Sequence, residues 1–179
     1  DRTVAAAEGL TVGTGLDAPD VGPLNHAAHR ETVREYVATG EREGATLATG
    51  GGVPDRDGYF VEPTVFTGVE PETTIAREEI FGPVLSVLSV ADAAEAVRIA
   101  NDVEYGLTAG VFARDVGRAL SVARDLEAGS VYVNEWFGGG VETPFGGRKH
   151  SGIGREKGLE GLDSYLQTKN VSIDLGGGY

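Results

Sequence analysis

Residues 84–134 read VLSVLSVADAAEAVRIANDVEYGLTAGVFARDVGRALSVARDLEAGSVYVN, the most regular hydrophobic pattern of the chain. Three apolar runs in it predict buried strands: Val84–Val90, Leu107–Phe112 and Ser130–Asn134. Between them lie two patterns of helical period, each preceded by an aspartate, Asp92 or Asp115, that can cap a helix N-terminus. This β-α-β-α-β order requires parallel strands with right-handed crossovers. We therefore predict an α/β fold with a parallel β-α-β-α-β core.

The flanking regions are less regular. Asn25 is expected to cap an earlier amphipathic helix, and a strand is expected within Tyr59–Phe66. Gly129 is expected at the C′ position that closes the second helix of the core. Within Tyr165–Leu175, apolar and polar residues alternate, which predicts a half-exposed strand. That strand could be an edge of its own sheet, or it could pair with another chain.

Charge and composition exclude several classes of function. The 179 residues contain 15 Lys+Arg against 28 Asp+Glu, a formal net charge of −13. This charge repels phosphate backbones and anionic lipids, so we expect no nucleic-acid and no membrane partner. An acidic composition in which arginine outnumbers lysine is also consistent with a salt-adapted, halophilic source. The cytoplasm is the expected location, since no run approaches 18 apolar residues and no basic leader opens the chain.

Two residue types are absent. Without cysteine, these residues can form no disulfide, no thiolate metal site and no cysteine nucleophile. Without methionine, a chain that begins at Asp1 is expected to be processed or a fragment.

Three motif-like patterns predict no function. Gly13–Ala18 fits a dinucleotide-binding glycine pattern, but Pro19 and the residues after it prevent the helix that this site needs. Ser151 beside His150 lacks the strand–turn–helix setting of a hydrolase serine. His26 and His29 have a spacing that a metal can use, but no third ligand accompanies them. We therefore expect two exposed histidines and no metal site.

The segment Arg77–Val84 carries a candidate binding pair. Of two adjacent acids on an extended chain, Glu78 and Glu79, one can face inward while the other faces solvent. Glu79 and Phe81, two residues apart, place a hydrogen-bond acceptor and a flat apolar face on the same side. Such a pair can hold a ribose hydroxyl and stack beside a planar ring. The alternative is a polar start to the strand with Phe81 in the core.

A second unusual segment is Asn134–Gly147, here called the aromatic loop. It follows the third predicted strand, the position at which α/β proteins place ligand-binding loops. It holds Trp136, the single tryptophan of the chain, together with Phe137 and Phe145, among many glycines. Aromatic side chains on such a loop are expected to line a pocket or an interface.

Taken together, several segments resemble the C-terminal portion of the NAD(P)-dependent aldehyde dehydrogenase superfamily. These segments, in order along nearly the whole chain, are Gly22-Pro23, Gly58–Thr64, Glu78–Val84, Asn101 with Tyr105–Leu107, Gly129–Asn134 and Thr143–Glu156. The resemblance implies that Glu79 holds the nicotinamide ribose and that Phe81 lies beside the nicotinamide ring. It also implies that Trp136, Phe137 and Phe145 line the aldehyde tunnel.

The resemblance further implies oxidation of an aldehyde to a carboxylic acid with NAD or NADP, through a cysteine thiohemiacetal and thioester. The cysteine and the general base would lie upstream of these residues, so the chain would hold no catalytic residue and would be inactive alone. Residues 1–147 would belong to the catalytic domain, and residues 148–179 would form a loop and an oligomerisation arm. In that arm, Tyr165–Leu175 would join a partner subunit's sheet in a homodimer or tetramer. The alternative is a non-enzymatic assembly or binding module that keeps this fold.

Overall fold

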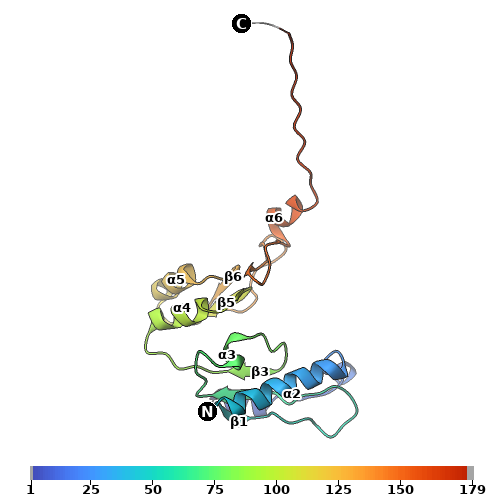
Figure 1. The fold of residues 1–179 in the computed structure, drawn as a ribbon, viewed down its shortest axis with the longest axis vertical. Helices are drawn as coiled ribbons and strands as arrows, with labels where there is room; N and C mark the ends of the chain where they lie inside the picture. The colour runs from blue at the N-terminus through green and yellow to red at the C-terminus, as the bar shows by residue number, and fades with distance from the viewer. Residues whose placement is uncertain (1, 177–179) are drawn as a thin grey trace. The chain divides into compact units, whose positions relative to one another are not determined.

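The computed structural model describes residues 2–176, which divide into two compact units, one ending at Ile99 and the other beginning at Ala100 (Figure 1). The elements of the first unit are α1 (Arg2–Glu8), a 3-10 turn (Gly15–Asp17), α2 (Ala27–Arg42), β1 (Thr46–Thr49), β2 (Thr64–Thr67), α3 (Thr74–Arg77) and β3 (Val84–Ser86). The helix α4 (Ala93–Asn101) crosses the boundary, and its last two residues, Ala100 and Asn101, belong to the second unit. The elements of the second unit are β4 (Tyr105–Gly106), β5 (Thr108–Val111), α5 (Val116–Asp125), β6 (Ser130–Val133), β7 (Arg148–Lys149) and α6 (Gly158–Asp163).

The first unit is built on a mixed three-stranded sheet. Its strand order is β1-β2-β3, with β1 antiparallel and β3 parallel to β2. α2 carries Val33 and Val37 into a core that also contains Phe66 of β2 and Ile75 of α3. Gly40 of α2 allows this close packing, since a Cβ there would lie 2.8 Å from the Ile75 side chain. α2 begins one residue later than predicted, because Nδ1 of His26, rather than Asn25, accepts the His29 amide at 3.0 Å.

The second unit contains a parallel strand pair crossed over by a helix. β5 and β6 pair in register from Thr108↔Ser130 to Val111↔Val133, and α5 lies against both (Figure 1). Asp115 caps α5 by accepting the Arg118 amide at 3.1 Å, and Asp92 accepts the Glu95 amide at 2.9 Å before α4. The predicted α/β class with parallel strands and both predicted aspartate caps is therefore confirmed.

The first predicted strand is shorter than predicted and pairs with a different strand. Val84–Val90 is a strand only over Val84–Ser86, and it pairs with β2 of its own unit. The strands of the predicted parallel core thus occur as two parallel pairs, β2 with β3 and β5 with β6. The partner of β3 is β2, which begins in the predicted Tyr59–Phe66 run and ends one residue beyond it; the pattern of residues 84–134 alone did not reveal this pairing.

Gly129 has a different role from the one predicted. α5 ends with Leu126 as its C-cap, so Gly129 is not at C′. A Cβ on Gly129 would lie 1.7 Å from the carbonyl oxygen of Gly146, which no side chain could tolerate. This glycine is required because the end of the aromatic loop passes directly against the chain that enters β6.

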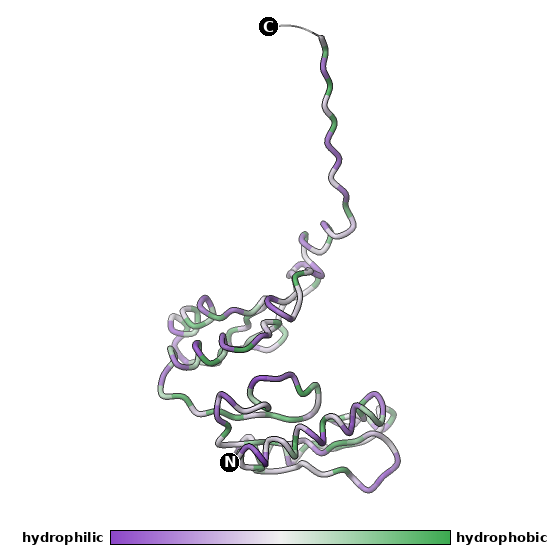
Figure 2. Tube along the Cα trace, in the orientation of Figure 1, coloured by the Kyte–Doolittle hydropathy of each residue, from purple (hydrophilic) through white to green (hydrophobic). Residues whose placement is uncertain are grey.

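The segment after α6 is extended and makes no strand pair with any described residue. It leaves α6 as a single trace, and its hydropathy alternates between polar and apolar (Figures 1 and 2). Val171, Ile173 and Leu175 are 71%, 73% and 91% exposed. An edge strand within its own sheet, one of the two alternatives considered for this segment, is therefore not observed.

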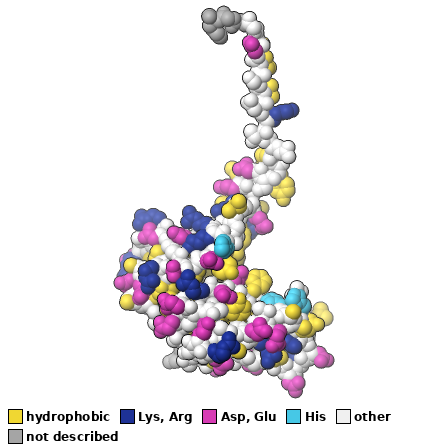
Figure 3. All heavy atoms as spheres, viewed as in Figure 1, with side chains coloured by type: hydrophobic (Ala, Val, Ile, Leu, Met, Phe, Trp, Pro, Cys, Tyr) yellow, Lys and Arg dark blue, Asp and Glu magenta, His cyan; other side chains and the backbone are white. Residues whose placement is uncertain are grey.

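Over residues 2–176 no helix has both the length and the apolar character needed to cross a membrane. Acidic side chains are spread over the visible surface of both units, with lysine and arginine among them (Figure 3).

Candidate functional site

The predicted cofactor pair lies in the first unit, on the chain between α3 and β3. Ile80 is buried, whereas Glu79 on one side of it and Phe81 on the other are exposed. Phe81 is 75% exposed and its backbone is left-handed, with φ 53°. A phenylalanine in this conformation costs about 1 kcal/mol or more, and the exposed ring recovers little of that through burial. The alternative of Phe81 in the core is therefore wrong, and the ring is free to contact a ligand.

The two adjacent glutamates have different surroundings. The hydroxyl of Tyr36, on α2, donates to Oε2 of Glu78 at 2.7 Å. The carboxylate of Glu79 accepts no hydrogen bond from any residue among 2–176. Glu78 thus holds α2 to this segment, and Glu79 keeps its full capacity to accept hydrogen bonds from a ligand.

His29 supports Phe81, which the sequence patterns did not reveal. Its Nε2 lies 2.8 Å from the Phe81 carbonyl oxygen, and the two rings are 6.0 Å apart. Because a carbonyl can only accept, Nε2 carries the proton. His29 is therefore half-buried and engaged rather than exposed, and among residues 2–176 no group of three or more His, Asp and Glu side chains could hold a metal ion.

The predicted tunnel residues lie in the second unit and contact one another. Ring centroids are 5.3 Å apart for Trp136 and Phe137, and 6.3 Å apart for Phe137 and Phe145. Tyr132 of β6 adds a fourth ring, 5.9 Å from Trp136 and 5.7 Å from Phe137. Trp136 and Phe137 remain more than half exposed, so the cluster offers aromatic faces to a ligand. The sequence predicted the three loop residues but not Tyr132, which strand periodicity alone could not distinguish from a core residue.

The aromatic loop is held where it leaves β6. Asn134 has a left-handed backbone, φ 58°, and its side chain pairs with the backbone of Ala113. Oδ1 accepts the Ala113 amide at 2.8 Å, while Nδ2 donates to the Ala113 carbonyl at 2.9 Å. Asn134 therefore joins the chain after β5 to the chain after β6 and fixes the direction in which the loop starts.

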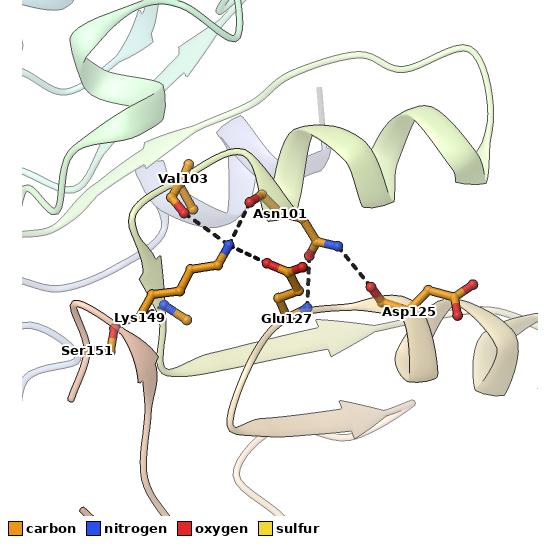
Figure 4. A network of polar contacts seen from close by, with 7 residues as sticks. Asn101, Val103, Asp125, Glu127, Lys149 and Ser151 are labelled. Atoms are coloured by element: carbon orange, nitrogen blue, oxygen red, sulfur yellow. Dashed lines mark hydrogen bonds and ion pairs between the residues drawn. The ribbon is translucent and has the colours of Figure 1, made fainter. Parts of the chain in front are cut away.

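The loop is also held where it returns, at β7, by a group we call the Lys149 cluster: Asn101, Val103, Glu127 and Lys149 (Figure 4). Nζ of Lys149 donates to the carbonyls of Asn101 and Val103 at 2.6 and 3.2 Å, and lies 2.7 Å from Oε2 of Glu127. The hydrogen bond and charge of Lys149 lower the pKa of the Glu127 carboxyl. The side chain of Asn101 in turn accepts the Glu127 amide and donates to the Asp125 carbonyl, each at 2.8 Å.

The model of the aldehyde dehydrogenase family matches residues 1–171. The chain belongs to the aldehyde dehydrogenase family. The resemblance predicted from the sequence is therefore confirmed.

Relatives and solved structures within the family are closely similar to this chain. The betaine aldehyde dehydrogenases of Brucella anthropi and Brucella melitensis are 48% and 47% identical to it over 181 residues, covering 98% of this chain and 37% of each relative. Betaine aldehyde dehydrogenase from Staphylococcus aureus in complex with NAD+ matches with a TM-score of 0.88 at 39% identity, covering 98% of this chain and 37% of that one. Aldehyde dehydrogenase from Mycobacterium tuberculosis complexed with NAD+ matches with a TM-score of 0.88 at 40% identity, covering 97% and 36%.

This family member spans a little over a third of the length of the relatives it matches. The similarity establishes family and fold over the whole chain, but it tests no single residue. The roles of Glu79, Phe81, Trp136, Phe137 and Phe145 therefore remain predictions, now with a described geometry.

Proposed function

We propose that this chain forms part of an NAD(P)-dependent aldehyde dehydrogenase that oxidises an aldehyde to a carboxylic acid. The observation that carries the proposal is the cofactor pair. Glu79 and Phe81 lie on either side of the buried Ile80. The Glu79 carboxylate has no partner among the described residues, and the Phe81 ring is exposed on a left-handed backbone. Neither feature contributes to folding, so both fit a ligand-binding role.

The pair has the chemistry that a nicotinamide nucleotide requires. Two ribose hydroxyls are donors, and the Glu79 carboxylate is an acceptor with no donor among the described residues. The flat ring of Phe81 can pack beside the nicotinamide and exclude water from one side of it. The bound nucleotide supplies the hydride acceptor, and this chain orients it. NAD and NADP are both compatible with these contacts; the Staphylococcus aureus and Mycobacterium tuberculosis structures contain NAD+.

We assign the aldehyde side of the reaction to the aromatic loop. Trp136, Phe137 and Phe145, with Tyr132, present several rings whose neighbouring centroids are 5.3–6.3 Å apart. Such faces attract a quaternary ammonium group by cation–π interaction, worth about 0.5–2 kcal/mol per contact. The named relatives are betaine aldehyde dehydrogenases. We therefore propose an aldehyde carrying a quaternary ammonium group, such as betaine aldehyde, as the substrate.

The bond-forming residues must come from outside these 179 residues. The chain has no cysteine to attack the carbonyl, so the thiolate and the base that activates water are assigned to other parts of the enzyme. Within the enzyme we assign residues 1–147 to the catalytic domain and residues 148–179 to a loop and arm. We propose a cytoplasmic location, where NAD(P) is supplied, and a salt-adapted source, in keeping with the charge of −13.

The arm is proposed to complete a homodimer or tetramer. Tyr165–Leu175 exposes an alternating apolar row, and from Gln167 to Leu175 its backbone makes no backbone hydrogen bond with any described residue. An extended strand of this kind gains backbone hydrogen bonds and apolar contacts by joining the sheet of a second copy. This assembly role accompanies the enzymatic one, whereas a module with assembly alone would have no use for Glu79 and Phe81.

The cofactor assignment is tested by comparing two neighbouring glutamates in the enzyme that contains this chain. Glu79→Gln removes a charged acceptor, a loss of about 1.5–3 kcal/mol, and should lower kcat/KM for NAD(P) roughly tenfold or more. Glu78→Gln is the matched control, because its side chain already serves Tyr36, and it should change kcat/KM less than about threefold. Small and equal effects of the two substitutions, measured by NAD(P)H absorbance, would remove the cofactor assignment.

A further inference from the structure

The aromatic loop returns to the fold through a very short strand. β7 contains only Arg148 and Lys149, and it pairs with the two residues of β4. A two-residue ladder of this kind is marginal by itself. Phe145 lies three residues before β7, so the position of β7 limits where the Phe145 ring can lie.

The side chain of Lys149 stabilises β7 beyond the two-residue ladder. Its backbone is left-handed, φ 52°, which costs a non-glycine residue about 1 kcal/mol or more. An ammonium group has three donors, and in this structure it has three oxygen partners: the carbonyls of Asn101 and Val103 and the carboxylate of Glu127. The lysine side chain is 25% exposed, so this charge is only partly screened by water.

Two of the chain segments that supply these oxygens, at Asn101 and at Glu127, are held by other contacts. Asn101 is the last residue of α4, and its side chain bonds to the backbone at the end of α5. The carbonyl of Glu127 lies against Gly106 of β4 so closely that a Cβ there would approach it to 2.4 Å. The backbone at Asn101 and at Glu127 is therefore held by contacts that do not involve Lys149 (Figure 4).

From β7 the constraint reaches the aromatic rings. The Gly146 carbonyl passes against Gly129, and Phe145 exchanges two backbone hydrogen bonds with Glu156, at 2.8 and 2.7 Å. The ring of Phe145 then contacts Phe137, which contacts Trp136. Loss of the Lys149 contacts would weaken this chain of contacts at its β7 end, while the Phe145–Glu156 hydrogen bonds and the Asn134 side chain would remain.

We propose that Lys149 is a positioning residue for substrate: through β7 it sets the place of Phe145 and so the spacing of the rings that receive the aldehyde. That these rings receive the aldehyde rests on the proposed function. The ordering of the loop by Lys149 does not depend on the proposed function. The two parts are tested separately.

The first test uses the enzyme that contains this chain and needs no activity measurement. Lys149→Met should increase amide hydrogen exchange in the peptide that contains Phe145 and Glu156, roughly tenfold or more, as expected for loss of local stability. Arg148→Met is the control, since Arg148 is exposed and is the other residue of the same strand. Adding propylammonium to Lys149→Ala should restore slow exchange, whereas sodium at the same ionic strength should not. Equal exchange in Lys149→Met and the unchanged chain would overturn the proposal.

The second test uses the enzyme that contains this chain. Lys149→Met should raise KM for the aldehyde roughly tenfold and leave KM for NAD(P) within about twofold, because the cofactor pair lies elsewhere in the sequence. Equal increases in both KM values would show a general structural role and overturn the proposal.

Should Lys149→Met fail to fold, Glu127→Gln, which leaves both carbonyl partners of Lys149 in place, should show a smaller effect of the same kind. An enzyme that reduces no NAD(P) with any aldehyde would contradict the proposed function, and the exchange test would still decide the role of Lys149.

Discussion

Phe81 combines two properties that folding does not favour: a left-handed backbone and a large apolar ring that is 75% exposed. The His29 imidazole donates to its carbonyl, and the buried neighbour Ile80 fixes the adjacent chain. The surrounding contacts maintain this backbone strain at an exposed aromatic residue. Backbone strain of this kind is typical of ligand sites.

This arrangement predicts that replacing Phe81 weakens nucleotide binding without lowering the stability of the protein. Glycine adopts a positive φ without steric cost, so Phe81→Gly should leave the free energy of unfolding unchanged or raise it by up to about 1 kcal/mol. The same substitution should weaken NAD(P) binding in the enzyme, because the ring is lost. Urea unfolding and nucleotide titration measure the two effects.

Phe66 provides the matched comparison for Phe81. It is fully buried in the core of the first unit, so Phe66→Ala should cost about 3–5 kcal/mol. If Phe81→Gly destabilised the protein by a similar amount, the ring would have a structural role that its exposure does not suggest.

Residue chemistry alone predicted this site incompletely. The spacing of Glu79 and Phe81 indicated a possible pair, but it could not exclude a buried Phe81, because the left-handed backbone depends on tertiary contacts. His29 was missed as a partner because it lies 52 residues before Phe81, and only the fold brings them together. The Lys149 cluster was missed for the same reason, since its members come from chain segments 101–103, 127 and 149.

At the scale of elements, local signals predicted the helices well. Asp92 and Asp115 both accept a backbone amide at the positions where their helices begin, as short-range capping rules require. Gly129 was misassigned because a glycine after a helix usually serves as C′, whereas here a distant carbonyl requires it. The partner of β3 was missed because strand pairing depends on long-range packing and not on the order of hydrophobic runs.

The extended segment after α6 makes its own prediction. If Tyr165–Leu175 joins the sheet of a second copy, truncation after Lys169 should shift the enzyme toward smaller species, because the apolar row of Val171, Ile173 and Leu175 would be lost. Size-exclusion chromatography with light scattering measures this. Val171→Thr with Ile173→Thr is a control that keeps the backbone length and should weaken assembly less. An unchanged mass after truncation would argue against strand exchange.

At the scale of the whole molecule, the two units differ in how much apolar surface they bury. The first contains a core of valine, phenylalanine and isoleucine side chains, whereas Ala119 is the single buried apolar side chain described in the second. Phe112, which follows β5, and Val116 and Leu120, one turn apart on α5, are more than half exposed. Apolar surface of this kind needs a cover, which we expect the rest of the enzyme to provide.

The lack of a nucleophile makes the activity of the 179-residue chain predictable. With no cysteine, it should produce no NAD(P)H from betaine aldehyde or from simple aldehydes above the rate without protein. The positive control is the enzyme containing this chain, assayed by absorbance under the same conditions. Clear turnover by the isolated chain would mean that another group attacks the carbonyl and that the assignment of the chemistry to other segments is wrong.

The oxygen cluster around Lys149 also determines how this protein reacts with acylating reagents. The chain has three lysines, and an amine must lose its proton and expose its lone pair before it can be acetylated or labelled. The amine of Lys149 donates to three oxygens and its side chain is 25% exposed, so a reagent has little access to it, whereas Lys157 and Lys169 are exposed residues. Side-chain acylation of the native protein therefore falls on Lys157 and Lys169, and a modified Lys149 marks molecules in which the loop has opened.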